Sequence, residues 1–343
     1  MSKLASTAPI KPTELGTVEE LASFGEITGR PVRQFRLCSS SGIEVEIIEY
    51  GAIIRTFKVP CKGTLRDIVL GFDSLSEYLQ QSSFIGSIVG PYANRIANAQ
   101  YELNGETIQL KANEGENILH SGSAGLHLKH WQGKIDQDQL VLTVSCAHNE
   151  AGFPGSVDIE ARYYFSDSST LALDITAKPS EARPISITQH SYFNLNGENS
   201  NETNQVLTVH SSHHLPVDES GIPIGEKLKN DQARMNLSLC DTKEASVDHH
   251  YCSKGGSLTA LASLKSSSRD LTLTVTSDAP GLQVYTGQYL PACSGKSNSS
   301  YQTRSGVCLE PQQWPDSPNN PAAPVSTIAQ GQVYTHRLRF EIS

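Results

Sequence analysis

Two separated segments carry the residue types that acid–base chemistry on a neutral substrate requires. The segment 306–319 places one carboxylate, Glu310, after a strand-like approach and before a rigid Pro-rich turn that contains Trp314. The segment 189–195 contains His190 among polar and aromatic neighbours. A carboxylate can take a proton, and an imidazole titrates near neutral pH and can donate one and recover it. We therefore predict Glu310 as a base on a pocket floor, with Trp314 stacking on the ligand and His190 as the proton partner.

Alternation along a strand places His190 on an unusual face. If this part of the chain is extended, Thr188, His190 and Tyr192 point to one side. The opposite side then carries Ile185, Ile187, Gln189 and Ser191. A polar and aromatic face is atypical of a core and favours a binding surface.

Other polar residues suit the hydroxyl groups of a sugar, each of which donates and accepts hydrogen bonds. Arg95 offers a planar fork of donors, and Asn94 offers both a donor and an acceptor. Asp248 can accept from a hydroxyl group, and Gln283 and Tyr285 share one face of a strand-like run. The structural alternative for Arg95 is a loop residue that binds a neighbouring carboxylate.

The remaining histidines do not predict a metal site. His120, His127 and His130 have spacings of 7 and 3, without a supporting carboxylate or Cys pattern. Neighbouring residues on a strand point to opposite faces, so neither His213-His214 nor His249-His250 readily chelates one ion. We expect these two pairs to be exposed loop histidines. The seven cysteines are widely spaced and include no CxxC, which indicates buried thiols rather than disulfides or a zinc knuckle.

Apolar residues at every second position predict the strands that must hold these side chains. Five runs show this alternation, namely 140–146, 157–165, 171–175, 271–275 and 338–342. Such a pattern is typical of antiparallel sheets with one buried face. Turn signals such as Asn104-Gly105 and Pro154-Gly155 separate the strands.

Helical signals are few. We predict two short helices, Thr17 to Phe24 and Leu75 to Leu79, and Ser74 with Glu77 forms a capping box for the second. The chain has no βαβ rhythm and no G-x-G-x-x-G motif, which argues against a nucleotide-binding α/β fold. The fold class indicated is all-β, a large antiparallel sandwich with few short helices.

Composition sets the remaining expectations. No linker divides the 343 residues, so we predict an N-terminal extension over residues 1–30 and one domain over 31–343. The net charge of -9 argues against nucleic acid or an anionic membrane as a partner. The chain lacks a secretory signal pattern and a long apolar run, so we expect a cytoplasmic protein. We also expect a monomer or a homodimer.

These segments together resemble the aldose 1-epimerase (galactose mutarotase) family. The likeness runs from about Ile43 to the C-terminus. It comprises Gly71–Asp73, Asn94–Ala97, Leu119-His120, Gly152–Gly155, His190–Leu195, Leu215–Asp218, Val247–His249, Gln283–Gly287 and Leu309–Asn319. Each segment is a weak signal, but their joint occurrence in this order is specific.

The resemblance implies a β-sandwich of the galactose mutarotase type. It also implies cofactor-free, metal-free interconversion of the α and β anomers of free hexoses such as D-galactose and D-glucose. Glu310 then resembles the general base and His190 the general acid. The substrate contacts implied are Asn94, Arg95, His120, Ser191, Tyr192, Asp248 and Gln283.

The chain departs from the family pattern at three places. Ser121 stands where the family has Gly after the histidine, Val247 stands where Phe often precedes the aspartate, and Pro91-Tyr92 replaces an Arg-containing turn. These changes affect loop shape and sugar preference rather than the acid and base.

Three other functions fit the same residues. A glycoside-acting enzyme usually needs two carboxylates, which Asp248 and Glu310 would supply. A phosphosugar 1-epimerase would need a cationic cluster, and Arg95 is the main cation near the matched segments. A non-catalytic sugar-binding module would bind an aldose and leave its mutarotation at the spontaneous rate.

Overall fold

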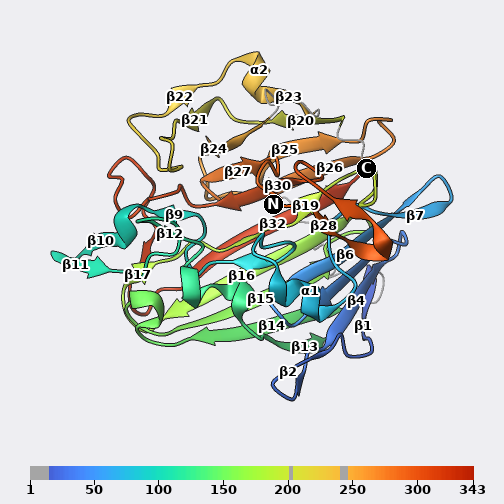
Figure 1. Ribbon diagram of the computed structural model, residues 1–343, viewed down its shortest axis with the longest axis horizontal. Helices are drawn as coiled ribbons and strands as arrows, with labels where there is room; N and C mark the ends of the chain where they lie inside the picture. Colours follow the sequence, from blue (N-terminus) through green and yellow to red (C-terminus); the bar gives the residue numbers. More distant parts are fainter. Residues whose placement is uncertain (1–14, 201–203, 240–245) are drawn as a thin grey trace, which may run out of the picture.

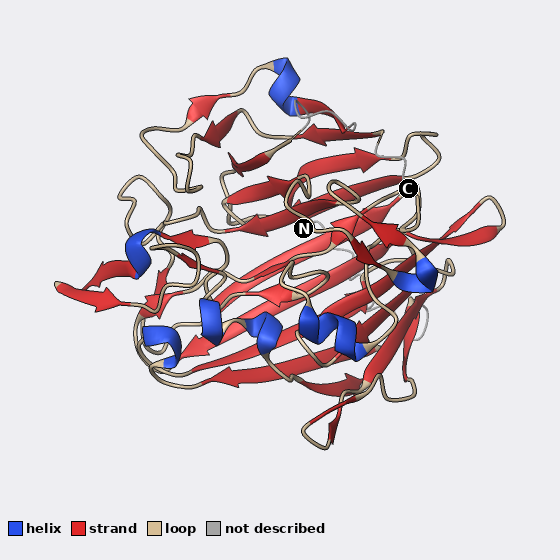
Figure 2. Cartoon of the chain, in the orientation of Figure 1, coloured by secondary structure: helices blue, strands red, loops and turns tan. Residues whose placement is uncertain are grey.

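The computed structural model describes residues 15–200, 204–239 and 246–343. Strands dominate this part of the chain, as Figure 2 shows. The described residues include two α-helices, α1 (Leu75–Gln80) and α2 (Gln232–Met235). They also include the short 3₁₀ helices η2 (Ala97–Ala99), η3 (Gly122–Ala124), η4 (Leu126–Leu128), η5 (Glu150–Gly152) and η7 (Lys296–Asn298). The predicted all-β class is confirmed.

The largest layer is a nine-stranded antiparallel sheet. Its strands follow the order β13 (Gln132–Asp136), β14 (Gln139–Cys146), β15 (Val157–Phe165), β16 (Thr170–Pro179), β32 (Tyr334–Ile342), β26 (Thr272–Ser277), β25 (Thr259–Lys265), β20 (Gln205–Val209) and β23 (Asn236–Leu239). All five alternating runs predicted from the sequence lie in this sheet. The C-terminal strand β32 pairs with both β16 and β26 and so closes the middle of the layer.

Two further sheets cover this layer. A six-stranded sheet has the order β19 (Tyr192–Phe193), β30 (Val307–Gln312), β27 (Gly281–Tyr285), β24 (Asp248–Cys252), β21 (His213–Leu215) and β22 (Leu228–Lys229). A five-stranded sheet has the order β1 (Gly16–Glu20), β4 (Gln34–Ser39), β5 (Glu44–Ile48), β6 (Ile53–Cys61) and β7 (Thr64–Asp67). In Figure 1, β22, β21, β24, β27 and β30 follow one another downward from the top of the view.

Six strand pairs complete the description. They are β2 (Glu26–Ile27) with β3 (Arg30–Pro31), β10 (Gln100–Leu103) with β11 (Glu106–Gln109), β9 (Arg95–Ile96) with β12 (Ile118–Leu119), β8 (Ile88–Val89) with β18 (Thr188–Gln189), β17 (Arg183–Pro184) with β31 (Thr327–Ile328), and β28 (Cys293–Ser294) with β29 (Ser300–Tyr301). The β10–β11 hairpin turns at Asn104-Gly105, as predicted.

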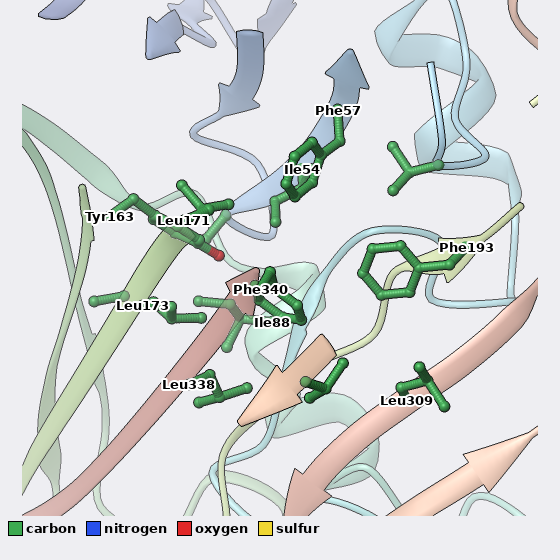
Figure 3. Close-up of a cluster of buried hydrophobic side chains, with 14 of the residues drawn as sticks. Ile54, Phe57, Ile88, Tyr163, Leu171, Leu173, Phe193, Leu309, Leu338 and Phe340 are labelled. Atoms are coloured by element: carbon green, nitrogen blue, oxygen red, sulfur yellow. The ribbon is translucent and has the colours of Figure 1, made fainter. Parts of the chain in front are cut away.

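One apolar core joins the three sheets. Figure 3 shows side chains from β6, β16, β19, β30 and β32 meeting in it. The rings of Phe193 on β19 and Phe340 on β32 lie 5.7 Å apart between centroids. Because the apolar faces of all three sheets meet in this cluster, the opposite face of the six-stranded sheet is left free to carry polar side chains.

The N-terminal helix prediction is wrong. Gly16–Glu20 forms β1, in which Val18 pairs with Leu37 of β4 and packs against the core. Part of the segment 1–30 is thus built into a sheet, and the domain boundary at residue 31 stays a prediction.

The second helix prediction is confirmed, since α1 begins after Ser74. The carboxylate of Glu77 accepts a hydrogen bond from the Ser74 backbone N–H at 2.9 Å, which is one half of the expected capping box. No helix in the described ranges is long and apolar enough to cross a membrane.

Candidate active site

A pocket of about 1340 Å³ opens on the polar face of the six-stranded sheet. Residues of β24, β27 and β30 alternate between this pocket and the core, so Leu282, Val284 and Leu309 are buried in the core while Gln283 and Glu310 face the pocket. Eight of the nine predicted site residues line it. They are Asn94, Arg95, His120, His190, Tyr192, Asp248, Gln283 and Glu310.

Glu310 is held on a central strand of this sheet. The strand β30 pairs with β19 on one side and β27 on the other, and the Glu310 side chain is almost completely buried. Burial raises the pKa of Glu310 well above its usual value; Asp248 raises it further, and Arg95 opposes the shift. The Glu310 carboxylate is therefore a strong proton acceptor.

His190 faces Glu310 from the break between β18 and β19. Hydrogen bonds to Ser87 and from Gly86 fix its backbone. Its Nε2 lies 3.7 Å from Glu310 Oε1, and its Nδ1 lies 3.5 Å from the thiol of Cys308. Burial lowers the pKa of His190 to about 4.

The two groups can hold one proton in two arrangements that have the same net charge, a carboxylate beside an imidazolium or a carboxylic acid beside a neutral imidazole. Burial favours the neutral arrangement, and hydrogen bonds to the carboxylate favour the charged one.

His120 is a hydrogen-bond donor toward the pocket. Its Nδ1 accepts from the backbone N–H of Asn94 at 3.1 Å, and its own backbone N–H donates to the Asn94 carbonyl. Burial lowers the pKa of His120 well below its usual value, so the ring is neutral and its single proton sits on Nε2.

This tautomer bears on metal binding. Ligand atoms of His120, His190 and Glu310 lie within 4.8 Å of one another, a spacing that would suit a metal ion. In His120, however, one nitrogen already accepts a hydrogen bond and the other carries the proton. The arrangement therefore favours donation to a substrate oxygen over metal coordination.

The other polar residues of the pocket already make hydrogen bonds within the protein. Arg95 binds Glu114 with two hydrogen bonds of 2.6 and 2.8 Å, which is the structural alternative considered for it, and it lines the pocket as well. Gln283 Nε2 donates to Asp248 Oδ1 at 2.6 Å. Burial raises the pKa of Asp248, while Arg95 and Gln283 lower it.

A family profile described as aldose 1-epimerase matches residues 33–341. The chain belongs to the aldose 1-epimerase family. It is 33% identical to the galactose mutarotase of Bos taurus over 336 residues, covering 94% of this chain and 98% of that protein. It is also 33% identical to the aldose 1-epimerase of Escherichia coli (strain K12) over 312 residues, covering 86% and 90% of the two chains.

Solved structures agree in fold. The aldose epimerase homologue from C. elegans superposes with a TM-score of 0.82 at 23% identity and covers 96% of this chain and 99% of its own. The galactose 1-epimerase from Lactobacillus acidophilus gives 0.81 at 20% identity. The predicted family and fold are confirmed, and the enzyme class is that of an isomerase acting on a small-molecule aldose.

Two of the residues predicted to contact the ligand do not line the pocket. Ser191 does not line the pocket; its neighbours His190 and Tyr192 do, and the side chain of Ser191 is buried away from it. Trp314 does not reach the pocket either. It is buried, donates from Nε1 to the Pro280 carbonyl, and lies beside the ring of His250.

The structure separates the clustered histidines. His127 and His130 do not join His120 around one point, since His130 bonds to Glu49 at 3.3 Å. The two tandem pairs lie on β21 and β24 rather than in exposed loops, and His214 and His250 are buried. One residue of each pair is thus hidden inside the fold.

Phe84 is a pocket residue that no sequence pattern indicated. Its ring lies 4.7 Å from those of His120 and His127 and 5.7 Å from that of His190, between centroids. Its backbone has φ of 57°, a left-handed conformation that is rare for an aromatic residue. Phe84 thus forms an apolar wall beside two of the predicted polar contacts.

Two departures from the family pattern contact each other. Ser121 has φ of 64°, where glycine would be strain-free. Its hydroxyl accepts from the Tyr92 backbone N–H at 2.8 Å and donates to the Tyr92 carbonyl at 3.2 Å. The serine thereby stabilises the Pro91-Tyr92 turn.

Proposed function

We propose that the protein interconverts the α and β anomers of free hexoses such as D-galactose and D-glucose, with Glu310 as general base and His190 as general acid. One observation carries this proposal. The two side chains meet at 3.7 Å on the floor of a pocket lined by sugar-type donors and acceptors. A base and an acid that face one substrate suffice for ring opening.

The reaction begins when Glu310 takes the proton of the C1 hydroxyl group. His190 gives its proton to the ring oxygen, the bond between C1 and that oxygen breaks, and the C1 carbonyl forms. The open aldehyde turns about the C1–C2 bond. The C5 hydroxyl then attacks the other face of the carbonyl, His190 recovers its proton from that hydroxyl, and Glu310 returns its proton to the C1 oxygen.

The surrounding residues orient the sugar. His120 donates from Nε2, and this donor can stabilise charge that develops on a sugar oxygen. Asp248 accepts a hydrogen bond from a sugar hydroxyl group, and Gln283 and Asn94 offer amide donors and acceptors. The Tyr192 ring packs beside His190, with the ring centroids 5.3 Å apart. Arg95 adds a positive charge beside the carboxylates.

The charge of the pocket favours an uncharged aldose over a sugar phosphate. Five carboxylates line it, and its cations are two arginines among the residues described. Arg95 is bound to Glu114, and Arg304 donates to the Ser246 hydroxyl at 3.2 Å. A phosphate group would meet net negative charge here, with no free cationic cluster to bind it.

The partner of Glu310 argues against glycoside hydrolysis. Glycosidases usually place a second carboxylate across the scissile bond. Here the group that faces Glu310 is the imidazole of His190, and Asp248 is bound to Gln283.

Polarimetry tests the proposal. Freshly dissolved α-D-galactose and α-D-glucose should approach their final rotation faster with the protein than without it. Glu310→Gln and His190→Asn should each lower kcat by roughly 10²–10⁴-fold, the usual contribution of one acid–base group. Glu226→Gln, an exposed position outside the pocket, is the control and should retain the full rate.

Two outcomes would contradict the proposal. Near-normal turnover in either active-site variant would remove that residue from its catalytic role. A folded protein that binds both sugars without accelerating mutarotation would instead be a binding module.

A further inference from the structure

A group of buried polar atoms lies behind Glu310 and has no partner in the mechanism. His250 and Gln312 are almost completely buried. Burial lowers the pKa of His250 and the Gln283 side chain lies close enough to oppose this shift, but neither ring nitrogen of His250 nor either amide atom of Gln312 makes a well-formed hydrogen bond in the described parts of the protein. The same holds for Oε1 of Gln283 and Oε2 of Glu310. Buried polar atoms are nearly always paired, so six such atoms in neighbouring residues require an explanation.

The register of the sheet brings these side chains together. His250 of β24 pairs with Gln283 of β27, which pairs with Glu310 of β30, so the three form one row on the pocket face. The next row is Cys252, Gly281 and Gln312. Gln312 is two residues along from Glu310, about 7 Å on the same face.

Gly281 lets the His250 ring cross the sheet toward Gln312. A Cβ atom at Gly281 would collide with the imidazole of His250, so the ring lies directly over this glycine. The neighbour of Gly281 on β30 is Gln312, one strand spacing of about 5 Å away. Trp314 closes the far side, with its ring centroid 6.4 Å from that of His250.

We propose that His250, Gln283 and Gln312 hold bound water behind Glu310, and that this water donates a hydrogen bond to Oε2 of the carboxylate. A buried water molecule typically makes about three hydrogen bonds and needs at least two polar partners. The six atoms supply both donors and acceptors, because the Gln312 amide and the neutral His250 ring each offer one of both kinds. His250 and Gln312 are thereby positioning residues that act on Glu310 through water.

This arrangement has a catalytic consequence, which rests on the proposed role of Glu310 as base. A donor to Oε2 stabilises the ionised carboxylate against its burial. The shared proton then resides on His190, which is where ring opening needs it. Without the water, the carboxylate keeps the proton and the pair stays in its unreactive neutral form.

The proposal also explains why polar side chains occupy these positions. Apolar residues of the same shape at all of these positions would be nearly neutral or stabilising, so folding alone does not require the polar atoms. Residues that cost stability and improve turnover are expected where function selects them. A purely structural role for Gln312 predicts a loss of stability without a loss of turnover when it is replaced.

Gln312→Leu is the central test, because leucine matches the shape of glutamine and removes both amide atoms. We expect kcat for anomer interconversion to fall about tenfold or more, the rate equivalent of one hydrogen bond to a charged group. KM should stay within about twofold, because Gln312 does not line the pocket. The thermal midpoint should be equal to or lower than that of the parent protein, because the buried polar atoms that remain are less well paired.

A second pair of variants keeps the test independent of one substitution. His250→Phe removes the ring nitrogens and should lower kcat as Gln312→Leu does. His250→Gln retains a donor and an acceptor and should keep more of the turnover. Equal kcat in the parent, His250→Phe and Gln312→Leu proteins would overturn the proposal, as would a lowered thermal midpoint with unchanged kcat.

A high-resolution crystal structure of the unmodified protein supplies a readout that does not depend on activity. We expect ordered water within about 3.2 Å of Glu310 Oε2 that also contacts Gln312 or His250, and its loss in Gln312→Leu. A direct His250–Gln312 hydrogen bond with no water beside Oε2 would overturn the proposal. Water present in a protein that fails to accelerate mutarotation would retain this site and refute the proposed function instead.

Discussion

In this pocket the role of a side chain depends on the hydrogen bond that its other polar atom makes within the protein. The Asn94 backbone N–H occupies Nδ1 of His120 and so makes Nε2 a donor. Gln283 occupies one oxygen of Asp248, which leaves the other for a ligand. Residue type alone is therefore a poor guide to role, because the hydrogen bond behind each group selects which atom faces the sugar.

Two substitutions at His120 separate its two nitrogens. His120→Asn keeps an acceptor close to the Nδ1 position and removes the Nε2 donor, so kcat should fall about a hundredfold while stability is retained. His120→Gln keeps a donor near Nε2 and leaves the Asn94 N–H unpaired, so it should retain more turnover and lose about 1–3 kcal/mol of unfolding free energy. Polarimetry and urea unfolding measure the two quantities. Equal kcat in both variants would show that the Nε2 proton has no role.

The family motifs indicate which segments meet at the pocket. Glu310 and His190 lie in the pocket as the resemblance implied. Trp314 and Ser191 lie in the same two motifs but do not line the pocket, because a motif does not say which face each of its residues occupies. Burial of Trp314 against His250 depends on a contact between two strands that are distant in sequence.

At the scale of elements, the site depends on three neighbouring strands. The strands β24, β27 and β30 present alternate residues to the core and to the pocket. Gly281 has no side chain, and the His250 ring fills the space that a side chain would take on the polar face of the sheet.

Gly281→Ala should disturb this fit. The new Cβ would meet the His250 ring and also the Tyr251 carbonyl at 2.8 Å, so we expect a loss of about 1–3 kcal/mol in unfolding free energy, measured with urea. The double variant Gly281→Ala/His250→Ala should recover part of this loss, with a coupling energy of at least about 0.5 kcal/mol. Strictly additive effects would mean that the ring does not lie over the glycine in solution.

The long strands were predictable because their period-2 pattern is local. Val157–Phe165 and Thr170–Pro179 alternate along their lengths and are strands as expected. The helix predicted for Thr17 to Phe24 does not form, because Gly16–Glu20 pairs with β4 instead. The two strands are separated in the sequence, so local composition does not indicate this pairing. The run from Ile185 to Tyr192 is interrupted between β18 and β19, and the interruption holds His190.

At the scale of the whole molecule, the fold buries an unusual share of its histidines. Seven of the eleven have a pKa lowered chiefly by burial. Their side chains are spread over the pocket, β21, β24 and the β32 region. This distribution could not be predicted from the sequence, because each histidine is hidden by contacts that only the packed sheets create.

This burial predicts a fall in stability on mild acidification. An unfolded histidine binds a proton below about pH 6.5, whereas the pKa of folded His127 and His190 is about 4. The unfolded state therefore binds more protons between these values, and stability falls as pH decreases from 6.5 toward 4. Each such group costs about 3 kcal/mol at the acid end. Glu198, Asp248 and Glu310 have raised pKa values, so their protonation makes the folded state more stable as the pH falls. These carboxyl groups are fewer than the buried histidines, so the net effect of acidification is a loss of stability.

Thermal unfolding followed by circular dichroism between pH 7 and 4.5 measures the effect. We expect the midpoint to fall by about 10 °C or more, because several kcal/mol are lost from a stability that is itself only about 5–15 kcal/mol. His250→Phe removes a group whose folded pKa is about 3 and should make the fall shallower. His148→Gln is the matched control, since the His148 side chain is 65% exposed and its replacement should leave the slope unchanged. A midpoint that is constant over this range would show that the imidazoles gain protons without unfolding, and hence that water reaches them in the native state.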